Sequence, residues 1–189
     1  MSKPSTTTQH PSQGQVRINA GIWRSRLIKF PQVEGLRPTP DRVRQTVFNW
    51  LGQDLTGKNC LDLFAGTGVM GFEALSRNAN SVVMVESNRF AWTSLKQNQS
   101  LLNTNHCSIF FDDVIHFLAK NTQVFDVVFC DPPYHQQWLD KVLPELKTHL
   151  SAQAIIYVEA EYALSSNAKF NVVKSGKAGA VYYHLVQFI

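Results

Sequence analysis

The sequence predicts an α/β fold in which a mostly parallel sheet carries helices on both faces. Three observations predict it. From residue 59 onward, short apolar runs alternate with segments of helical periodicity, the pattern of strand–helix–strand units. A glycine-rich loop at 65–68 separates the first apolar run from the first helical segment. The C-terminal region holds two β-prone segments joined by a glycine-containing turn. We therefore expect a Rossmann-like fold with seven strands, ending in an antiparallel hairpin.

The elements can be justified in order along the chain. Residues 21–24 combine glycine with apolar and aromatic residues and fit a small hairpin. Thr39 and Pro40 predict a helix start, with the threonine as N-cap and the proline at the first helical position. Apolar residues then recur at helical spacing from Val43 to Leu51. The remaining predicted elements are strands at 59–64, 81–86, 107–111, 125–130 and 154–159, helices at 69–77, 88–102, 114–120 and about 137–150, the last interrupted near Pro144, and hairpin strands at 171–175 and 180–188 joined through 176–179.

The composition indicates one globular domain. With 189 residues, 44% of them hydrophobic, the chain can bury one ordinary core. We divide it into a disordered tail at 1–14, a basic hairpin-and-helix extension at 15–57 and a main domain at 58–189. The tail is polar and lacks the apolar core of a signal peptide, and no segment is apolar enough to span a membrane. We therefore expect a cytoplasmic protein, acting as a monomer.

The cysteine and histidine residues show no pattern of a disulfide or metal site. Cys60, Cys107 and Cys130 lie far apart, and two of them fall inside predicted strands, as expected of buried, reduced thiols. The six histidines have no ligand spacing. We expect no metal.

Positive charge is concentrated near the N-terminus. The chain has 18 Lys and Arg residues and 14 Asp and Glu residues. Residues 1–57 hold eight basic and three acidic ones, a charge of +5, and the remainder carries −1. A basic arm on a near-neutral body indicates a polyanionic partner, although charge alone fits a solvated basic surface equally well. If the partner is a nucleic acid, we expect four arginines to contact its phosphates: Arg17, Arg24, Arg37 and Arg42.

The most informative stretch follows the apolar run at 125–130. Asp131, Pro132, Pro133 and Tyr134 combine a carboxylate, a free backbone carbonyl and an aromatic ring. Each proline fixes its own φ, and the first also restricts Asp131, so these groups are held with little freedom. Acceptors beside a stacking ring suit the amino group of a planar base. The same residues also fit a rigid turn with a packed tyrosine, so the motif alone leaves both interpretations open.

Residues at the ends of successive predicted strands favour a nucleoside cofactor. Glycines in the loop after the first strand let backbone amides approach a ligand at a helix start, and Glu86 ends the second strand, where an acid can bind a ribose. The Asp62 carboxylate would attract the cationic amino acid end of S-adenosylmethionine and repel a dinucleotide phosphate. Asp113, after the third strand, can accept from an adenine amino group or cap the next helix. The candidate cofactor-binding residues are Asp62, Phe64, Ala65, Gly66, Thr67, Gly68, Glu86, Asn88 and Asp113.

Several stretches of the chain together resemble one family. The segments 36–44, 61–71, 73–77, 127–134 and 156–159 are similar to those of the bacterial RsmD family, and the similarity runs from about residue 15 to residue 188. The first segment, with its Arg-Pro-Thr-Pro-Asp-Arg helix entry, is more discriminating than the glycine loop. The resemblance implies a Rossmann-like class I S-adenosylmethionine-dependent methyltransferase fold. It further implies methylation of the 2-amino group of one guanine, guanine 966, of 16S ribosomal RNA, in the small ribosomal subunit or its assembly intermediate.

The resemblance also implies roles for individual residues. Residues 62–68 would form the cofactor loop, Glu86 would bind the ribose hydroxyls and Asp113 would bind adenine. Residues 131–134 would hold the target guanine. The chain departs from the common pattern two residues after Glu86, where an acid is frequent and this chain has Asn88, whose amide can still form hydrogen bonds.

Three alternatives stay open at the level of the sequence. A DNA amino-methyltransferase acting on adenine or cytosine also fits residues 131–134, although the chain is short and shows no separate target-recognition domain. A non-catalytic RNA-binding or assembly factor would keep the fold without the chemistry, and the intact Asp131 and glycine loop argue against it. A dinucleotide oxidoreductase rests on the glycine fingerprint alone.

Overall fold

The computed structural model describes residues 11–134 and 137–189. Most of the predicted disordered tail therefore lies outside the described residues, and β1 begins at Gln13, two residues before the predicted start of the extension. The elements in chain order are β1 (Gln13–Arg17), β2 (Leu27–Pro31), α1 (Asp41–Leu51), β3 (Asn59–Asp62), α2 (Val69–Ser76), β4 (Ser81–Glu86), α3 (Arg89–Leu102), β5 (Cys107–Phe111), α4 (Val114–Lys120), β6 (Phe125–Cys130), α5 (Trp138–Leu146), a 3-10 turn (Lys147–His149), β7 (Leu150–Ala160), β8 (Phe170–Ala178) and β9 (Val181–Phe188).

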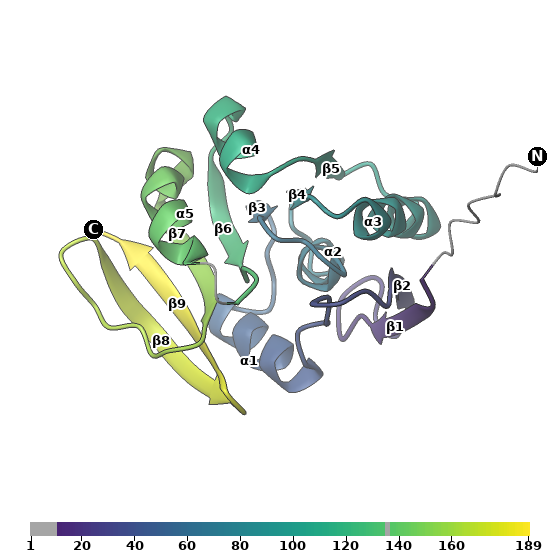
Figure 1. The fold of residues 1–189 in the computed structure, drawn as a ribbon, viewed down its shortest axis with the longest axis horizontal. Coiled ribbons are helices and arrows are strands. Elements are labelled where there is room, and N and C mark those ends of the chain that lie inside the picture. Colours follow the sequence, from purple (N-terminus) through teal and green to yellow (C-terminus); the bar gives the residue numbers. More distant parts are fainter. Residues whose placement is uncertain (1–10, 135–136) are drawn as a thin grey trace, which may run out of the picture.

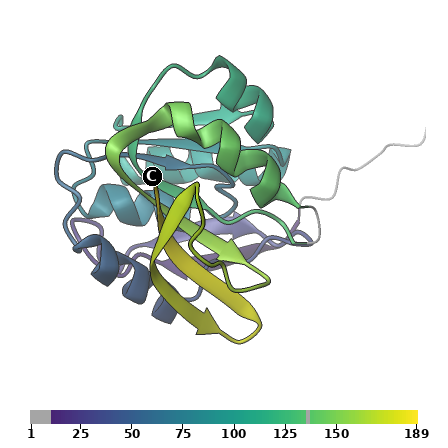
Figure 2. The ribbon, with the colours of Figure 1, turned by 90° about the vertical axis from the view of Figure 1, so that its left-hand side faces the viewer.

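Seven strands form the central sheet in the order β5-β4-β3-β6-β7-β9-β8. The strands from β5 to β7 are parallel, and β9 and β8 add an antiparallel hairpin at one edge. Figure 2 shows this hairpin in yellow. The predicted fold class is confirmed. The order of the strands reverses between β3 and β6, and open α/β sheets bind ligands at such a switch point, beside the carboxyl ends of the strands.

Helices cover both faces of the sheet because its central strands are apolar on both faces. In β6, Val127 and Phe129 point to one side, and Val128 and Cys130 point to the other. α1, α2 and α3 pack on the Phe129 side, whereas α4 and α5 pack on the opposite side. Figure 1 shows these two helical layers with the strands between them.

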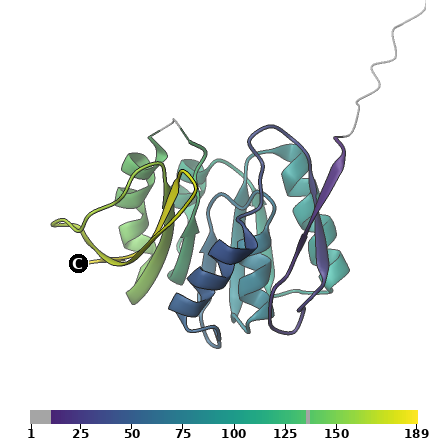
Figure 3. The same cartoon turned by 90° about the horizontal axis from the view of Figure 1, so that it is seen from below.

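The N-terminal extension packs on the same side as α1. β1 and β2 pair in antiparallel fashion, which confirms the predicted hairpin, and Val16 and Ile28 join the apolar core on that side. The backbone of Lys29 is tied to α3: its N–H donates to Asn98 Oδ1 (3.0 Å), and its carbonyl accepts from Asn98 Nδ2 and Ser94 Oγ (both 2.7 Å). Figure 3 shows the hairpin and α1 together over this side. The extension therefore shares the core of the main domain.

Several element boundaries differ from the prediction. The residue before α1 is Pro40, and no side chain caps the helix, so the predicted N-cap at Thr39 is wrong. The Thr39 carbonyl instead accepts a hydrogen bond from Arg44 Nε (3.1 Å). α5 ends at Leu146, soon after Pro144, and β7 begins at Leu150. β3 ends at Asp62, because the chain turns into the glycine loop there.

The C-terminal hairpin turns later than the sequence predicted. Gly176 lies inside β8, opposite Tyr183 of β9. A Cβ atom on this glycine would lie 2.4 Å from Tyr183 Cζ, so the residue permits close packing of the ring instead of forming the turn. Gly179, with a φ of 61°, makes the turn.

Candidate active site

Four carboxylates gather at the carboxyl edge of the sheet. Asp62 ends β3, Glu86 ends β4, Asp131 follows β6, and Glu159 lies near the end of β7. These four strands are neighbours and run in the same direction, so their carboxyl ends meet on both sides of the switch point. The structure thus brings together three predicted site residues and one, Glu159, that was not predicted.

Asp62 is buried directly below the start of α2. Its Oδ2 accepts a hydrogen bond from the N–H of Gly71 (3.1 Å), which requires a close approach of helix and strand. A Cβ atom on Gly71 would lie 2.4 Å from Met84 Cε and 3.2 Å from Asp62 Oδ2, so a larger residue there would have to displace the end of the Met84 side chain and would crowd the carboxylate. Burial raises the pKa of Asp62 to about 7, against the opposing effect of the Gly71 hydrogen bond, and the charge of Glu86 adds to the rise.

The glycine loop is held against Glu86. The carboxylate accepts from the N–H groups of Gly66 (2.7 Å) and Asn88 (2.6 Å), and burial still raises its pKa. Gly66 and Gly68 have φ values of 51° and 76°, a conformation that favours glycine. The Ser87 backbone also donates to this carboxylate, which offers about four acceptor positions in all. Glu86 can therefore hold the loop and accept a further donor at the same time.

The other loop residues face the protein interior. Ala65 N–H donates to the Val85 carbonyl (3.0 Å), and Thr67 Oγ1 accepts from Val69 N–H (3.3 Å). The ring of Phe64 packs edge-on against Trp138 of α5, with centroids 5.5 Å apart. Trp138 lies a few residues after Tyr134, so this contact links the glycine loop to the segment that follows β6.

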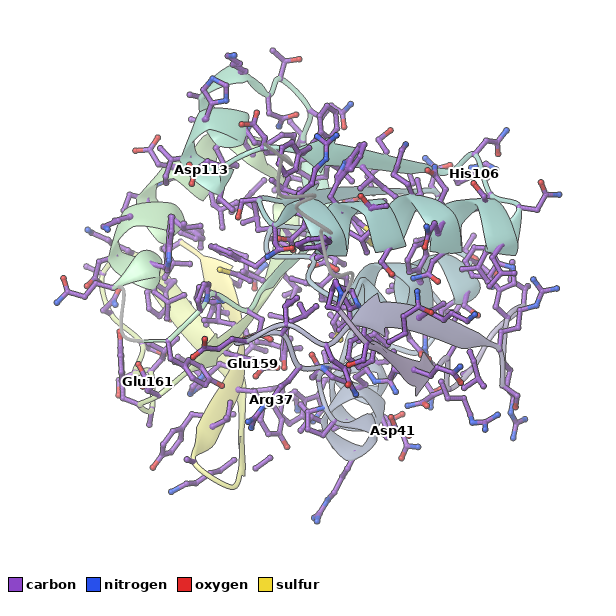
Figure 4. All side chains as sticks on the ribbon, turned by 45° about the vertical axis from the view of Figure 1, so that its right-hand side comes forward. Arg37, Asp41, His106, Asp113, Glu159 and Glu161 are labelled. Carbon is purple, nitrogen blue, oxygen red and sulfur yellow. The ribbon has the colours of Figure 1, made fainter. Side chains whose placement is uncertain are left out.

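Asn88 and Asp113 both act as helix caps. Asn88 Oδ1 accepts from the N–H groups at the start of α3 (2.9 and 3.1 Å). Asp113 Oδ1 does the same for α4 (2.9 and 3.3 Å), and Figure 4 shows Asp113 at that helix start. The capping alternative for Asp113 is therefore confirmed, and cofactor roles for both residues stay predictions that would use their remaining polar atoms.

The segment Asp131–Tyr134 leaves the sheet at the switch point. Pro132 is buried, whereas Pro133 and Tyr134 are exposed. The Asp131 carboxylate accepts no hydrogen bond from any described residue. Burial raises its pKa well above the ordinary value, and the charges of Glu159 and Asp62 raise it further. Partial burial and the nearby Asp131 and Glu159 raise the pKa of Tyr134 to about 12, so its hydroxyl is neutral at physiological pH.

Glu159 and Tyr157 are part of the site although sequence reasoning gave them no role. Both side chains are buried, and the Tyr157 hydroxyl donates a hydrogen bond to Glu159 Oε1. Burial raises the pKa of Glu159. The sequence offered one signal for Glu159, which is an acid at the end of an apolar strand. This signal becomes useful only when the strand order is known, because β7 must lie next to β6, the strand that precedes Asp131.

The four arginines expected to contact phosphates lie in two separate groups. All four side chains are exposed. Arg37 lies beside the glycine loop, because the side chain of Leu36 packs against Gly66. Arg42 lies in the first turn of α1, and Figure 4 shows Arg37 in the segment that leads to this helix.

Arg17 and Arg24 lie at the opposite end of α2. The hairpin loop caps that end, with Ile22 N–H donating to the Ser76 carbonyl (2.8 Å), roughly 12 Å along the helix from its start at the glycine loop. Arg17 Nη1 donates to the Ser25 carbonyl in the same loop (3.0 Å). Arg24 lines an open depression of about 520 Å³. The other residues that line it are Asn19, Ala20, Gly21, Gln45, Asn49, Gln53 and Arg77.

The four carboxylates of the edge have no lysine or arginine partner among the described residues; the ion pairs in that part of the chain lie elsewhere. Asp62 and Glu159 are buried, and Glu86 and Asp131 are half-buried. Acids in such surroundings without a cation would repel a phosphate and favour a ligand that carries positive charge and hydrogen-bond donors. Residues 11–134 and 137–189 contain no cluster of potential metal ligands. No helix within the same ranges is both long and apolar enough to cross a membrane.

Comparison with known proteins identifies the family. A family model described as "Conserved hypothetical protein 95" matches residues 16–187. The Escherichia coli (strain K12) protein named ribosomal RNA small subunit methyltransferase D is 36% identical, over 99% of this chain and 95% of the relative. The protein of the same name from Haemophilus influenzae is 41% identical, over 93% of this chain and 95% of the relative. The chain belongs to the RsmD family.

A solved structure agrees with this assignment. It is that of an Escherichia coli protein named as a methyltransferase, with 38% sequence identity and a TM-score of 0.83, covering 93% of this chain and 98% of that chain. Family and fold together identify a methyltransferase and indicate S-adenosylmethionine as its cofactor, as the sequence predicted. The oxidoreductase alternative is thereby set aside.

Proposed function

We propose that this protein transfers the methyl group of S-adenosylmethionine to the exocyclic 2-amino group of one guanine in 16S ribosomal RNA, the family target guanine 966. The observation that carries the proposal is the carboxyl edge of the sheet, where buried and half-buried acids without a cationic partner among the described residues meet the rigid Asp131–Tyr134 segment. The names of the relatives support small-subunit ribosomal RNA as the substrate. The partner would be the small ribosomal subunit or its assembly intermediate, and the reaction would take place in the cytoplasm.

Asp62 and Glu86 are the residues that would hold the cofactor. Asp62 Oδ1 accepts no hydrogen bond from a described residue, so it is available to the cationic amino group. Glu86 accepts backbone hydrogen bonds from Gly66, Asn88 and Ser87 and keeps one acceptor position for a ribose hydroxyl. The backbone of the glycine loop would lie against the nucleoside, as in other nucleotide sites at a helix start. Bound S-adenosylmethionine supplies an electrophilic methyl group on a sulfonium centre.

Asp131 and Pro132 would make the target amine reactive. The lone pair of a 2-amino nitrogen is delocalised into the purine, so the amine is a poor nucleophile. Hydrogen bonds from its two N–H groups to the Asp131 carboxylate and the Pro132 carbonyl, at about 3 Å, would turn the lone pair toward the methyl group. Tyr134, exposed beside these acceptors, would stack on the base.

The transfer is a single displacement. The bond between the amino nitrogen and the methyl carbon forms as the carbon–sulfur bond breaks, and the bonding electron pair leaves on sulfur. The nitrogen then bears positive charge, which the Asp131 carboxylate stabilises, and its extra proton passes to Asp131 or to a water molecule. The guanine must leave its stack to reach Asp131, so an unpaired nucleotide is the expected target.

The proposal is tested by transfer of labelled methyl from S-adenosylmethionine to three acceptors: small ribosomal subunits and protein-free ribosomal RNA, both from cells that lack the enzyme, and DNA. We expect N2-methylguanosine at one site of the ribosomal RNA. Label in adenine or cytosine of DNA would support the DNA methyltransferase alternative. Absence of label in all three acceptors, together with failure to bind the cofactor, would support the assembly factor.

A further inference from the structure

Asp131 and Glu159 lie next to each other at the ends of two paired strands. β6 and β7 are parallel, and their register pairs Phe129 with Tyr157 and Cys130 with Val158. Continued by one residue past the end of β6, this register sets Asp131 opposite Glu159, on the same side of the sheet as Phe129 and Tyr157. Consistent with this proximity, Glu159 is the charged group that raises the pKa of Asp131 most.

The two carboxylates keep most of their acceptor positions free. Tyr157 donates to Oε1 of Glu159, and among the described residues no donor reaches Oε2 of Glu159 or either oxygen of Asp131. Tyr157 is itself fixed by the core, since its ring packs edge-on against Phe129 with centroids 6.4 Å apart. Two neighbouring acids with little access to water destabilise the ligand-free fold. They suit a ligand that brings two adjacent hydrogen-bond donors.

Among the amino-bearing bases, this requirement separates guanine from adenine and cytosine. Guanine presents its N1–H beside the 2-amino group, so two neighbouring positions both donate. Adenine places the acceptor N1 beside its 6-amino group, and cytosine places the acceptor N3 beside its 4-amino group. An acid facing the ring nitrogen therefore pairs with guanine and repels the other two bases.

We propose that Glu159 is the specificity-determining residue for guanine: it accepts the N1–H while Asp131 and the Pro132 carbonyl accept the 2-amino group. Tyr157 is a positioning residue, which holds Oε1 so that Oε2 meets the base. The inference rests on the proposed function and adds the reason why a motif suited to any exocyclic amine acts on guanine. A site built to pair with a substrate N–H discriminates strongly against an analogue that lacks it, because its buried acceptor is then left without a donor.

The test uses 2-aminopurine, which keeps the 2-amino group and has an acceptor at N1. Small-subunit particles are reconstituted with RNA in which the methylated nucleotide is either guanosine or 2-aminopurine riboside. Initial rates are measured for the wild type, Glu159→Gln and Tyr157→Phe. Glu161→Gln, a change of the next acid along the chain, is the matched control. Comparing the rate ratio for the two bases between enzymes cancels the intrinsic difference in their reactivity.

We expect the wild type and Glu161→Gln to methylate guanosine at least about 100-fold faster than 2-aminopurine riboside. A discrimination of this size is expected when a substrate analogue lacks the N–H that a polar site is built to bind. Glu159→Gln should narrow that preference at least about tenfold, because its amide N–H can donate to N1 of 2-aminopurine. Tyr157→Phe keeps the acid but not its hydrogen bond, so it should narrow the preference less. Thermal denaturation and cofactor binding show whether each variant is folded.

The outcomes separate the inference from the function on which it rests. If Glu159→Gln and Tyr157→Phe slow transfer to both bases equally, the preference is unchanged and the inference is wrong, while the proposed function stands. If the wild type methylates no guanosine in ribosomal RNA, the proposed function and the inference both fail. If Glu159→Gln does not fold, an unchanged preference in a folded Tyr157→Phe overturns the inference.

Discussion

Arg44 on α1 and Glu73 on α2 form a completely buried ion pair, with Arg44 Nη1 and Glu73 Oε2 3.2 Å apart and no exposed surface on either side chain. Glu73 also accepts from the backbone N–H groups of Asn19 (2.7 Å) and Ala20 (3.0 Å) and pairs with Arg77 Nη2 (2.9 Å). One carboxylate therefore joins α1, α2 and the N-terminal hairpin. Since its partners reach it from three segments, removing its charge takes the counter-ion from Arg77 and leaves Arg44 with the exposed Asp41 as its ion-pair partner.

Glu73→Gln should lower the free energy of unfolding by about 3–5 kcal/mol, the usual effect of breaking a buried ion pair at one partner. Urea denaturation monitored by tryptophan fluorescence measures the loss. Glu145→Gln, at an exposed position of α5, serves as the control and should change stability by less than about 0.5 kcal/mol. A loss below about 1 kcal/mol for Glu73→Gln would show that the network contributes little.

Asp62→Asn should stabilise the ligand-free protein at pH 8. Burial raises the pKa of Asp62 from 3.8 to about 7, so between these values the folded state retains a proton that the unfolded state releases. The free energy of unfolding therefore falls as the pH rises through this window, by up to about 4 kcal/mol for this group. Asparagine carries no charge, so in the variant the free energy of unfolding should not show this group's fall with rising pH. Denaturation curves from pH 4 to pH 8 measure it, and an identical pH dependence in the two proteins would contradict the assignment.

Asp62→Ala and Asp131→Ala should separate cofactor binding from chemistry. Asp131→Ala should bind S-adenosylmethionine like the wild type and lose methyl transfer by at least about 100-fold, because the amine loses its acceptor and the developing positive charge loses its partner. Asp62→Ala should mainly weaken cofactor binding. Isothermal titration with the cofactor and single-turnover transfer measure the two effects independently. Full activity of Asp131→Ala would remove the proposed mechanism.

Arg37→Ala should weaken RNA binding more than Arg24→Ala. Arg37 lies beside the glycine loop, whereas Arg24 lies near the far end of α2. Loss of one phosphate contact lowers the slope of affinity against salt concentration by about one counterion and leaves the rate at saturation unchanged. Filter binding of ribosomal RNA at several salt concentrations tests this. An equal loss for both variants would indicate an RNA path that also covers the hairpin loop.

Much of the fold could be predicted because it depends on local patterns. The alternation of apolar runs with helical segments, the glycine loop and the C-terminal β-prone segments each involve neighbours in sequence. The errors came from side-chain contacts that only the folded chain reveals. Gly176 resembled a turn residue, although it is a packing residue opposite Tyr183, and Thr39 resembled an N-cap, although its carbonyl pairs with the buried Arg44.

The sequence by itself determined the fold class, the family resemblance and the Asp131–Tyr134 segment, because each is written in residues adjacent along the chain. Only the tertiary structure decided which distant residues meet. The register of β6 and β7 places Glu159 beside Asp131, and the packing of α1 on α2 buries Arg44 against Glu73. Contacts at opposite ends of α2 likewise separate Arg37 from Arg17 and Arg24, which the sequence presented as one basic arm. Burial and strand pairing depend on the whole chain. The low-dielectric surroundings that raise the pKa values of the acids at the sheet edge therefore cannot be inferred from any single segment.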